Sequence, residues 1–446
     1  MNSKAIKTAA FYSPPLTKRK VKALNGLIDD HLSLVNFFVE RGLEANISSR
    51  IRLHGLFYEE SKKIIPSDKI HSKYRYTALE VASAILKNHA KRGGKRPEIK
   101  RKFIKLYHEN YNEKGSVFRI AKKDDKYFLV VKVRKRKEIV IPLTVSDYQR
   151  QFIEAYFNGR LKIGEAVLKL EGGIAIVYIP FVREVGEKNT ENIMAIDVNE
   201  RNVALSVFSP DGKLLFSKYI DISRLVAIDS TYVNAARKLT SRLYRGINPR
   251  YLPRWVREKV KKRLKRWKKR KEDIVHKLSK YIVDIALSYN AEIVMEDLKR
   301  IKERILSKNN KSGLNRRFSL ANFRKIQNFI EYKAKWHGIR VSYVNPAHTS
   351  SICPFCGSKL SSPDDGENKD PMGRRALYCP KCRRYYHRDF IATLNLFRKY
   401  KEKKREMCGV CVPHEGPMKA IRMGAVLPDG VWHRGNLAVT MSPGYG

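Results

Sequence analysis

Three acidic residues stand far apart in the sequence, each within or beside an apolar segment. Asp197 lies in IMAIDV, Glu296 ends the apolar run IVM, and Asp389 precedes the stretch FIATLNLF. A buried carboxylate needs a partner, and a cluster of carboxylates without a paired base is typical of a divalent-cation site. Two cations about 3.5–4 Å apart can bridge one scissile phosphate, one activating water and the other stabilising the leaving oxygen. The three acids are therefore candidate catalytic metal ligands.

The acids differ in how well an ordinary structural role explains them. Asp389 can cap the N-terminus of its helix, which is the commonest role of an aspartate before an apolar helix. Glu296 ends a predicted strand, where open α/β sheets commonly place their sites. The neighbouring Asp297 points to the other face of that strand and is a weaker candidate. Asp284 has the spacing of a solvated helix residue.

Four cysteines form two C-x-x-C pairs with the spacing of a tetrahedral zinc site. They are Cys353 and Cys356 in CPFCG, and Cys379 and Cys382 in CPKC. Gly357 follows the first pair, where a residue without Cβ allows backbone N–H groups to turn towards the sulfurs. Four thiolates fill the coordination sphere, so the predicted Zn²⁺ is structural.

A third pair, Cys408 and Cys411, has His414 nearby but no partner pair, and we interpret it as ordinary thiols. All six cysteines lie near the C-terminal end, which favours metal binding in a reducing compartment over a disulfide framework. The longest strongly apolar run, 174–182, contains Pro180 and is too short to cross a bilayer. The N-terminus has no apolar core of a secretory signal. We therefore expect a soluble, intracellular protein.

The chain is strongly basic, with 92 Lys and Arg against 44 Asp and Glu and a formal net charge of +48. Such an excess repels itself unless a polyanion neutralises it, which favours nucleic acid over an anionic membrane. Segment 254–271 has one acid, Glu258, among a dozen cations, whereas a solvated helix normally intersperses acids. Segments 91–102 and 132–138 are further candidates for phosphate contacts. The candidates in the first segment are Arg254, Arg257, Lys261, Lys262, Arg263, Lys265, Arg266 and Lys269.

The hydrophobic pattern changes twice along the chain. Residues 17–105 have helical periodicity, and a Thr77/Glu80 capping box predicts the start of one helix. Residues 106–186 alternate with period two and turn at KKDDK and at Glu171-Gly172-Gly173, which predicts a small β-barrel or sandwich. From residue 192 the order is three strands, helix, strand and helix, the order of the RNase H fold. Residues 406–446 show no periodicity and are expected to form a flexible tail.

The chain resembles the TnpB family of transposon-encoded proteins, which are related to type V CRISPR effectors. The motifs that carry the resemblance are IDVNERNVAL, IVMEDL, NPAHTSSICPFCG, CPKC and YYHRDFIATLN. The resemblance rests on specific motifs over about residues 190–400. Over residues 1–186 it rests only on the order of helices and strands. It implies RNA-guided cleavage of double-stranded DNA beside a short flanking motif by a RuvC-like domain, with base pairing reading the rest of the target.

The resemblance also implies the partners and cofactors. The partners are a guide RNA from the transposon end and double-stranded target DNA, in the cytoplasm of a prokaryote and on the nucleoid when DNA is bound. The catalytic cofactor is Mg²⁺, two ions, with Mn²⁺ able to substitute; the zinc is structural. Asp197, Glu296 and Asp389 become the metal-binding acids, and Arg388 a residue near the scissile phosphate. The oligomeric state stays open.

The resulting fold class is multidomain α+β, with an RNase H-like (RuvC) α/β nuclease domain that holds an inserted zinc ribbon. The expected domains are a first wedge strand at 1–16, a helical recognition lobe at 17–105, a β-barrel wedge domain at 106–186, a RuvC-like domain at 187–345 with a basic helical region at 230–272, a zinc ribbon at 346–388, the last RuvC helix at 389–405 and the tail at 406–446.

Two departures from the family pattern raise the question of weaker cleavage. Asn199 stands where the family usually has Gly, and Ile391 stands where a polar residue is usual. Three alternatives to guided cleavage remain: an RNA-guided binder that no longer cuts, a transposase that breaks and joins DNA ends itself, and a non-enzymatic zinc-ribbon RNA-binding protein.

Overall fold

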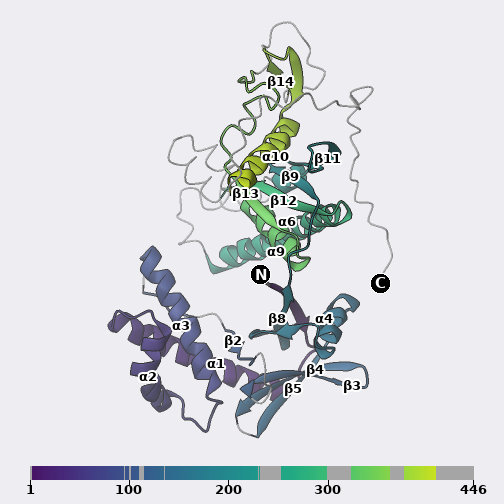
Figure 1. The fold of residues 1–446 in the computed structure, drawn as a ribbon. Helices are drawn as coiled ribbons and strands as arrows, with labels where there is room; N and C mark the ends of the chain where they lie inside the picture. Colours follow the sequence, from purple (N-terminus) through teal and green to yellow (C-terminus); the bar gives the residue numbers. More distant parts are fainter. Residues whose placement is uncertain are drawn as a thin grey trace. The chain divides into compact units, whose positions relative to one another are not determined.

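The computed structural model describes residues 3–94, 96–99, 102–109, 115–134, 136–229, 231, 253–298, 323–361 and 376–407. The chain divides into two units. The first comprises residues 1–187 and 335–338, and the second comprises 188–334 and 339–446. Figure 1 shows their helices and strands along the chain. The Cys408, Cys411 and His414 side chains and the tail beyond 407 lie outside the described residues.

Three helices open the first unit after strand β1: α1 (Lys18–Glu44), α2 (Arg50–Ile64) and α3 (Lys73–Arg92). The helical periodicity predicted here is confirmed in α1, whose residues Leu24 and Phe38 are fully inaccessible. The capping box predicted at Thr77 is wrong, because α3 begins four residues earlier and Thr77 lies buried inside it. Its hydroxyl contacts His31 Nε2 at 3.2 Å, so tertiary packing rather than a helix end explains this threonine.

The strands of the first unit form two antiparallel sheets. One has the order β1-β8-β7-β2, with β6 paired to β8, and the other has the order β3-β4-β5. Both predicted hairpins are confirmed, because β3 pairs with β4 across the KKDDK turn and β7 with β8 across the Gly172-Gly173 turn. Strand bounds are β1 Ser3–Tyr12, β2 Ile104–Leu106, β3 Phe118–Lys123, β4 Lys126–Arg134, β5 Lys137–Leu143, β6 Lys162–Ile163, β7 Ala166–Glu171 and β8 Ile174–Val185, with helix α4 at Asp147–Phe157.

The expected β-barrel is not closed among the described residues. The two sheets meet at one corner through an isolated bridge between Tyr12 and Thr144. At another corner a single backbone hydrogen bond joins Val117 to Tyr107. The first corner does not continue as a ladder because Pro14 and Pro15 follow β1 and have no N–H to donate. The described strands therefore form two sheets that share one apolar core and are joined at two corners.

The second unit is built on a five-stranded sheet of order β11-β10-β9-β12-β13. Strands β9, β10 and β11 are antiparallel neighbours, whereas β12 runs parallel to both β9 and β13. The predicted succession of elements from residue 192 is confirmed. Bounds are β9 Asn192–Val198, β10 Asn202–Phe208, β11 Leu214–Asp221, α6 Arg254–Ser288, β12 Ala291–Glu296, α9 Phe323–Trp336, β13 Val341–Val344, β14 Ala376–Cys379, β15 Arg384–His387 and α10 Arg388–Met407.

Helices cover both faces of this sheet (Figure 1). Met194 and Ile196 of β9 share one apolar cluster with residues of α6 and α9. Ile193 and Ala195 share another with Leu394 and other residues of α10. Side chains of a strand alternate between its faces, so Asp197 falls on the face that α10 covers.

None of the helices in the described ranges is both long enough and apolar enough to span a lipid bilayer.

Candidate active site and metal centre

The structure brings the three predicted acids together at one edge of the second unit's sheet. Met295 of β12 pairs in parallel register with Ile196 of β9, so Glu296 and Asp197 follow side by side at the carboxyl ends of adjacent strands. Asp389 lies in the first turn of α10 and is 3% exposed. Helix α10 packs against β9, β10, β12 and β13 (Figure 1). The Asp389 carboxylate reaches the same edge, because Asn199 bonds to both Asp389 and Asp197.

Burial raises the pKa of two of these carboxylates, and nearby negative charge adds to the effect at Asp197. Burial, then the nearby Glu296 and Asp389, raise the pKa of Asp197 to about 7, against the opposing hydrogen bond from Asn199 and the charge of Arg388. Burial also raises the pKa of Glu296, against a hydrogen bond from Thr349 and the charge of Lys399. A divalent cation would supply the missing positive charge, and hard carboxylate oxygens suit Mg²⁺ or Mn²⁺. The donor set therefore fits the implied ion.

Asn199 lies between two of the acids. Its Nδ2 donates to Asp197 Oδ2 at 2.7 Å, to Asn202 Oδ1 at 3.1 Å and to Asp389 Oδ1 at 3.3 Å. The side-chain amide thus ties the β9 carboxylate to the α10 carboxylate. The sequence marked Asn199 only as a departure from a pattern, and its role as a bridge became visible from the fold.

Ile391 does not take the place we expected beside the acids. It is fully buried and packs in an apolar cluster with Cys353, Leu360 and Cys379. Ile391 therefore belongs to the core under the cysteines, and its apolar character suits that core. The polar residue that faces the sheet from α10 is Thr393, whose hydroxyl lies 2.8 Å from Ser206 Oγ.

Thr349 and Gln327, which the sequence did not single out, hold Glu296. Thr349 Oγ1 donates to Glu296 Oε1 at 2.6 Å, and Gln327 Nε2 donates to the Glu296 backbone oxygen at 2.8 Å. Thr349 stands in the NPAHTSSICPFCG motif. The motif pointed to this region of the sequence but did not indicate that Thr349 contacts Glu296.

The four predicted cysteines form the compact metal-ligating set of the described residues, with their Sγ atoms all within 4.8 Å of one another. Cys353 and Cys382 Sγ are 3.8 Å apart, and Cys356 and Cys379 Sγ are 3.4 Å apart. Zinc with Zn–S bonds of about 2.3 Å places tetrahedral sulfurs about 3.8 Å apart, whereas a disulfide requires about 2.05 Å. The spacing therefore fits a tetrahedral ion and no disulfide.

Both C-x-x-C pairs make the same turn. Gly357 N donates to Cys353 O at 3.0 Å, and Arg383 N donates to Cys379 O at 2.8 Å. The residue after each pair has a positive φ, 75° at Gly357 and 53° at Arg383. The predicted need for glycine is met in the first turn, while the second turn holds a side chain in the left-handed region.

The predicted basic segment forms the first half of α6, which continues as one helix through Ser288. All of its candidate contact residues whose side chains are described are exposed; the Lys261 side chain is not described. Arg254 is paired with Glu258 at 3.0 Å. Trp255 is half exposed and lies under Lys259. Arg388 is exposed next to Asp389. Positions 230 and 232–252 of the expected basic region lie outside the described residues.

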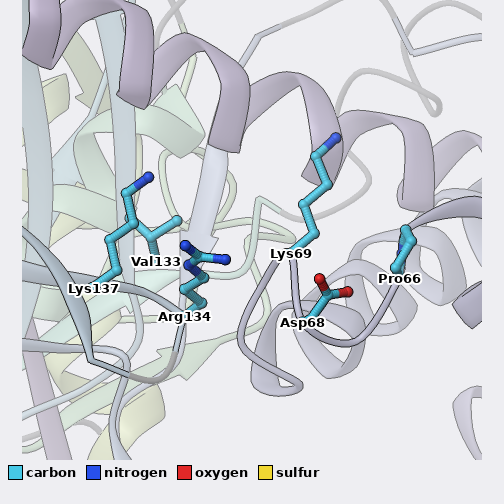
Figure 2. A pocket seen from close by; sticks show the side chains of 6 residues that line it. All are labelled: Pro66, Asp68, Lys69, Val133, Arg134 and Lys137. Atoms are coloured by element: carbon cyan, nitrogen blue, oxygen red, sulfur yellow. The ribbon is translucent and has the colours of Figure 1, made fainter.

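The first unit contains a cavity of about 300 Å³ on part of the predicted basic segment 132–138. Figure 2 shows the six side chains that line it. Three are cations and one is an acid, which suits an anionic ligand. They are Pro66, Asp68, Lys69, Val133, Arg134 and Lys137.

Comparisons with known proteins identify relatives of this chain. The family model described as Cas12f1-like, TNB domain, matches residues 323–396. The TnpB-like protein MJ0751 of Methanocaldococcus jannaschii is 41% identical over 264 residues, 59% of this chain and 87% of that protein. The CRISPR-associated endodeoxyribonuclease Cas12f2 of a Micrarchaeota archaeon is 36% identical over 123 residues, 27% of this chain and 21% of that protein.

Among solved structures, the cryo-EM structure of the Cas12f1-sgRNA-target DNA complex is similar, with a TM-score of 0.59 and 16% identity. The match covers 85% of this chain and 81% of that chain. At this identity the likeness concerns the fold, a multidomain α+β architecture.

Removing the charge of Asp197 should change how stability depends on pH. The folded-state pKa, about 7, lies above the ordinary 3.8, so the folded protein holds this proton more tightly and loses stability as pH rises between these values. In EDTA, Asp197→Asn should therefore raise Tm by several degrees at pH 8 and by much less at pH 5. Asp284→Asn, on an exposed residue of α6, is the control. Equal Tm differences for Asp197→Asn at both pH values would contradict the assignment.

Replacing one cysteine should remove the predicted zinc. Cys379→Ser is expected to lower bound zinc from one ion per chain to near zero, measured by elemental analysis, and to lower Tm because a structural ion stabilises only the folded state. A chelator should lower the Tm of the unaltered protein similarly. Cys408→Ser is the control, since that pair is interpreted as ordinary thiols. Full zinc content in Cys379→Ser would refute the site.

Proposed function

We propose that this chain, which belongs to the TnpB family, is an RNA-guided DNA endonuclease encoded by a transposon. The observation that carries the proposal is the meeting of Asp197, Glu296 and Asp389 at one edge of the second unit's sheet. Asp197 and Asp389 are buried, Glu296 is partly buried, and the pKa values of Asp197 and Glu296 are raised, so the cluster has no evident structural purpose without a cation. The reaction proposed is hydrolysis of a DNA phosphodiester beside a short flanking motif, after base pairing with the guide.

The acidic site has the parts that this reaction requires. When bound, two Mg²⁺ ions, or Mn²⁺ in their place, would supply an activated water and stabilise the leaving oxygen. Asp197, Glu296 and Asp389 would hold the ions. Arg388 is exposed beside Asp389 and is proposed to contact the phosphate. Thr349 and Gln327 orient Glu296 through its carboxylate and its backbone oxygen.

The remaining parts of the chain are assigned to support this RuvC-like, RNase H-type site. We propose that Cys353, Cys356, Cys379 and Cys382 hold a structural zinc in a ribbon over 346–388. Helices α1 to α3 form the recognition lobe, and the two sheets of the first unit form the wedge domain. The proposed setting is the cytoplasm of a prokaryote, on the nucleoid while DNA is bound.

Guide RNA and target DNA are the proposed nucleic-acid partners, and the basic surfaces are the proposed contacts. Exposed cations along the first half of α6 suit a phosphate backbone. Contacts between cations and phosphates supply affinity but do not read the base sequence. The cavity of Figure 2 adds Lys69, Arg134 and Lys137 in the first unit, and we assign it to an RNA phosphate.

A second candidate is an RNA-guided DNA binder that does not cut. The observation that favours it is the Asn199 amide, which donates to both Asp197 and Asp389. If these hydrogen bonds persist when metal is supplied, the two carboxylates stay engaged by the amide and the protein only binds.

Guided cleavage of a plasmid decides between these candidates. Protein co-expressed with its transposon-end RNA should cut a matched plasmid in Mg²⁺ and leave it intact in EDTA. Asp197→Ala should abolish cutting while RNA and DNA binding persist, because only a metal ligand is lost. Binding without cutting by the unaltered protein would favour the second candidate. Joined products formed without RNA would indicate a transposase, and random co-purifying RNA would contradict guiding altogether.

Neutralising part of the basic helix should weaken RNA binding in a salt-dependent way. Lys265→Ala combined with Arg266→Ala should make the slope of log affinity against log salt shallower by roughly 1 to 2, since each phosphate contact contributes about 0.7–0.9 to its magnitude. Lys280→Ala, at an exposed position farther along α6, is the control. An unchanged slope in the double variant would remove these residues from the interface.

A further inference from the structure

One short segment links the candidate acidic site to the cysteine centre. Residues 345–352 connect β13 with the first cysteine pair, and Thr349 in this segment is 5% exposed. Thr349 Oγ1 donates to Glu296 Oε1 at 2.6 Å and lies 3.1 Å from the Pro346 backbone oxygen. The threonine hydroxyl is therefore in direct contact with the carboxylate, while its backbone belongs to a turn outside the sheet.

Helix α10 holds this turn from the other side. Asn395 Nδ2 donates to Thr349 O at 2.7 Å and to Ile352 O at 2.8 Å, and Asn395 is only 7% exposed. Lys399 Nζ donates to Asn345 O at 3.1 Å and also to Ala347 O. These two α10 residues satisfy backbone carbonyls that would otherwise be poorly paired in an irregular segment.

The turn is also held in an unusual backbone conformation. His348, directly before Thr349, has a φ of 62°, which is uncommon for a residue with a Cβ. Such a conformation persists where the surroundings determine it, and it recurs at functional sites. Here the surroundings are the α10 contacts, and the result is a threonine hydroxyl directed at Glu296.

We propose that Thr349 is a positioning residue that fixes the Glu296 carboxylate for cation binding, and that Asn395 positions Thr349. This inference rests on the proposed function of the acidic site and deepens it. The helix that carries Asp389 also carries Asn395, so one rigid element sets both the third carboxylate and the orientation of the second. Removing a hydrogen-bond partner of a metal ligand typically lowers metal affinity or activity by 10–100-fold.

The test uses Mn²⁺ binding to the full-length zinc-loaded protein, followed by electron paramagnetic resonance, with Asp197→Asn defining the signal of the acidic site. Thr349→Val keeps the side-chain shape without the hydroxyl and should weaken Asp197-dependent binding by about tenfold or more. Thr349→Ser keeps the hydroxyl and should restore most of the affinity. Asn395→Asp removes the two donated hydrogen bonds and should weaken binding in the same direction. Zinc content should stay at one ion per chain in all variants.

Rescue by serine separates positioning from a merely structural role, because serine lacks the methyl group and packs less well than valine. Unchanged Mn²⁺ affinity in Thr349→Val, or equal losses in the valine and serine variants, would overturn the proposal. Absence of Asp197-dependent Mn²⁺ binding in the unaltered protein would overturn both this proposal and the proposed metal site. Failure of guided cleavage with the Thr349 dependence of Mn²⁺ binding intact would overturn the proposed function alone.

Discussion

The burial of the Asp197 carboxylate beside Glu296 and Asp389 is the constraint on which the second unit depends. Raising the pKa of Asp197 from 3.8 to about 7 corresponds to a cost on the order of 4 kcal/mol when this group ionises in the folded protein. A folded protein tolerates this unfavourable free energy only if packing elsewhere is strong enough to hold the groups in place. Strands β9 and β12 provide that packing, with Met194, Ile196, Ile293 and Met295 all fully buried beneath the site.

Helix α10 is the element that turns a sheet edge into a site. Its apolar residues Leu394 and Phe397 pack on the sheet, and its first turn carries Asp389. Its polar residues hold the segment before the cysteines, where Asn395 bonds to Thr349 and Ile352. Ile391 completes the core beneath the cysteines. Because one helix makes all these contacts, the acidic site and the cysteine centre form neighbouring parts of one packed structure.

The sequence was sufficient to predict the succession of strands and helices from residue 192, and with it the positions of Asp197 within one strand and Glu296 at the end of another. The cysteine set also followed from spacing, because C-x-x-C pairs make a local turn. Contacts that depend on long-range packing could not be predicted in this way. The bridging amide of Asn199 and the core position of Ile391 both require knowledge of where α10 lies. Thr77 matched a capping motif, but burial against His31 determined its position instead.

The most direct test of the account is a crystal structure of the zinc-loaded protein grown with Mn²⁺, with an anomalous difference map collected at the manganese edge. Manganese peaks are expected among the carboxylates of Asp197, Glu296 and Asp389, with the Asn199 amide no longer donating to Asp197 and with Thr349 still bonded to Glu296. An empty map in this region, with Asn199 still bridging Asp197 and Asp389, would contradict the claim that the three acids form a cation site.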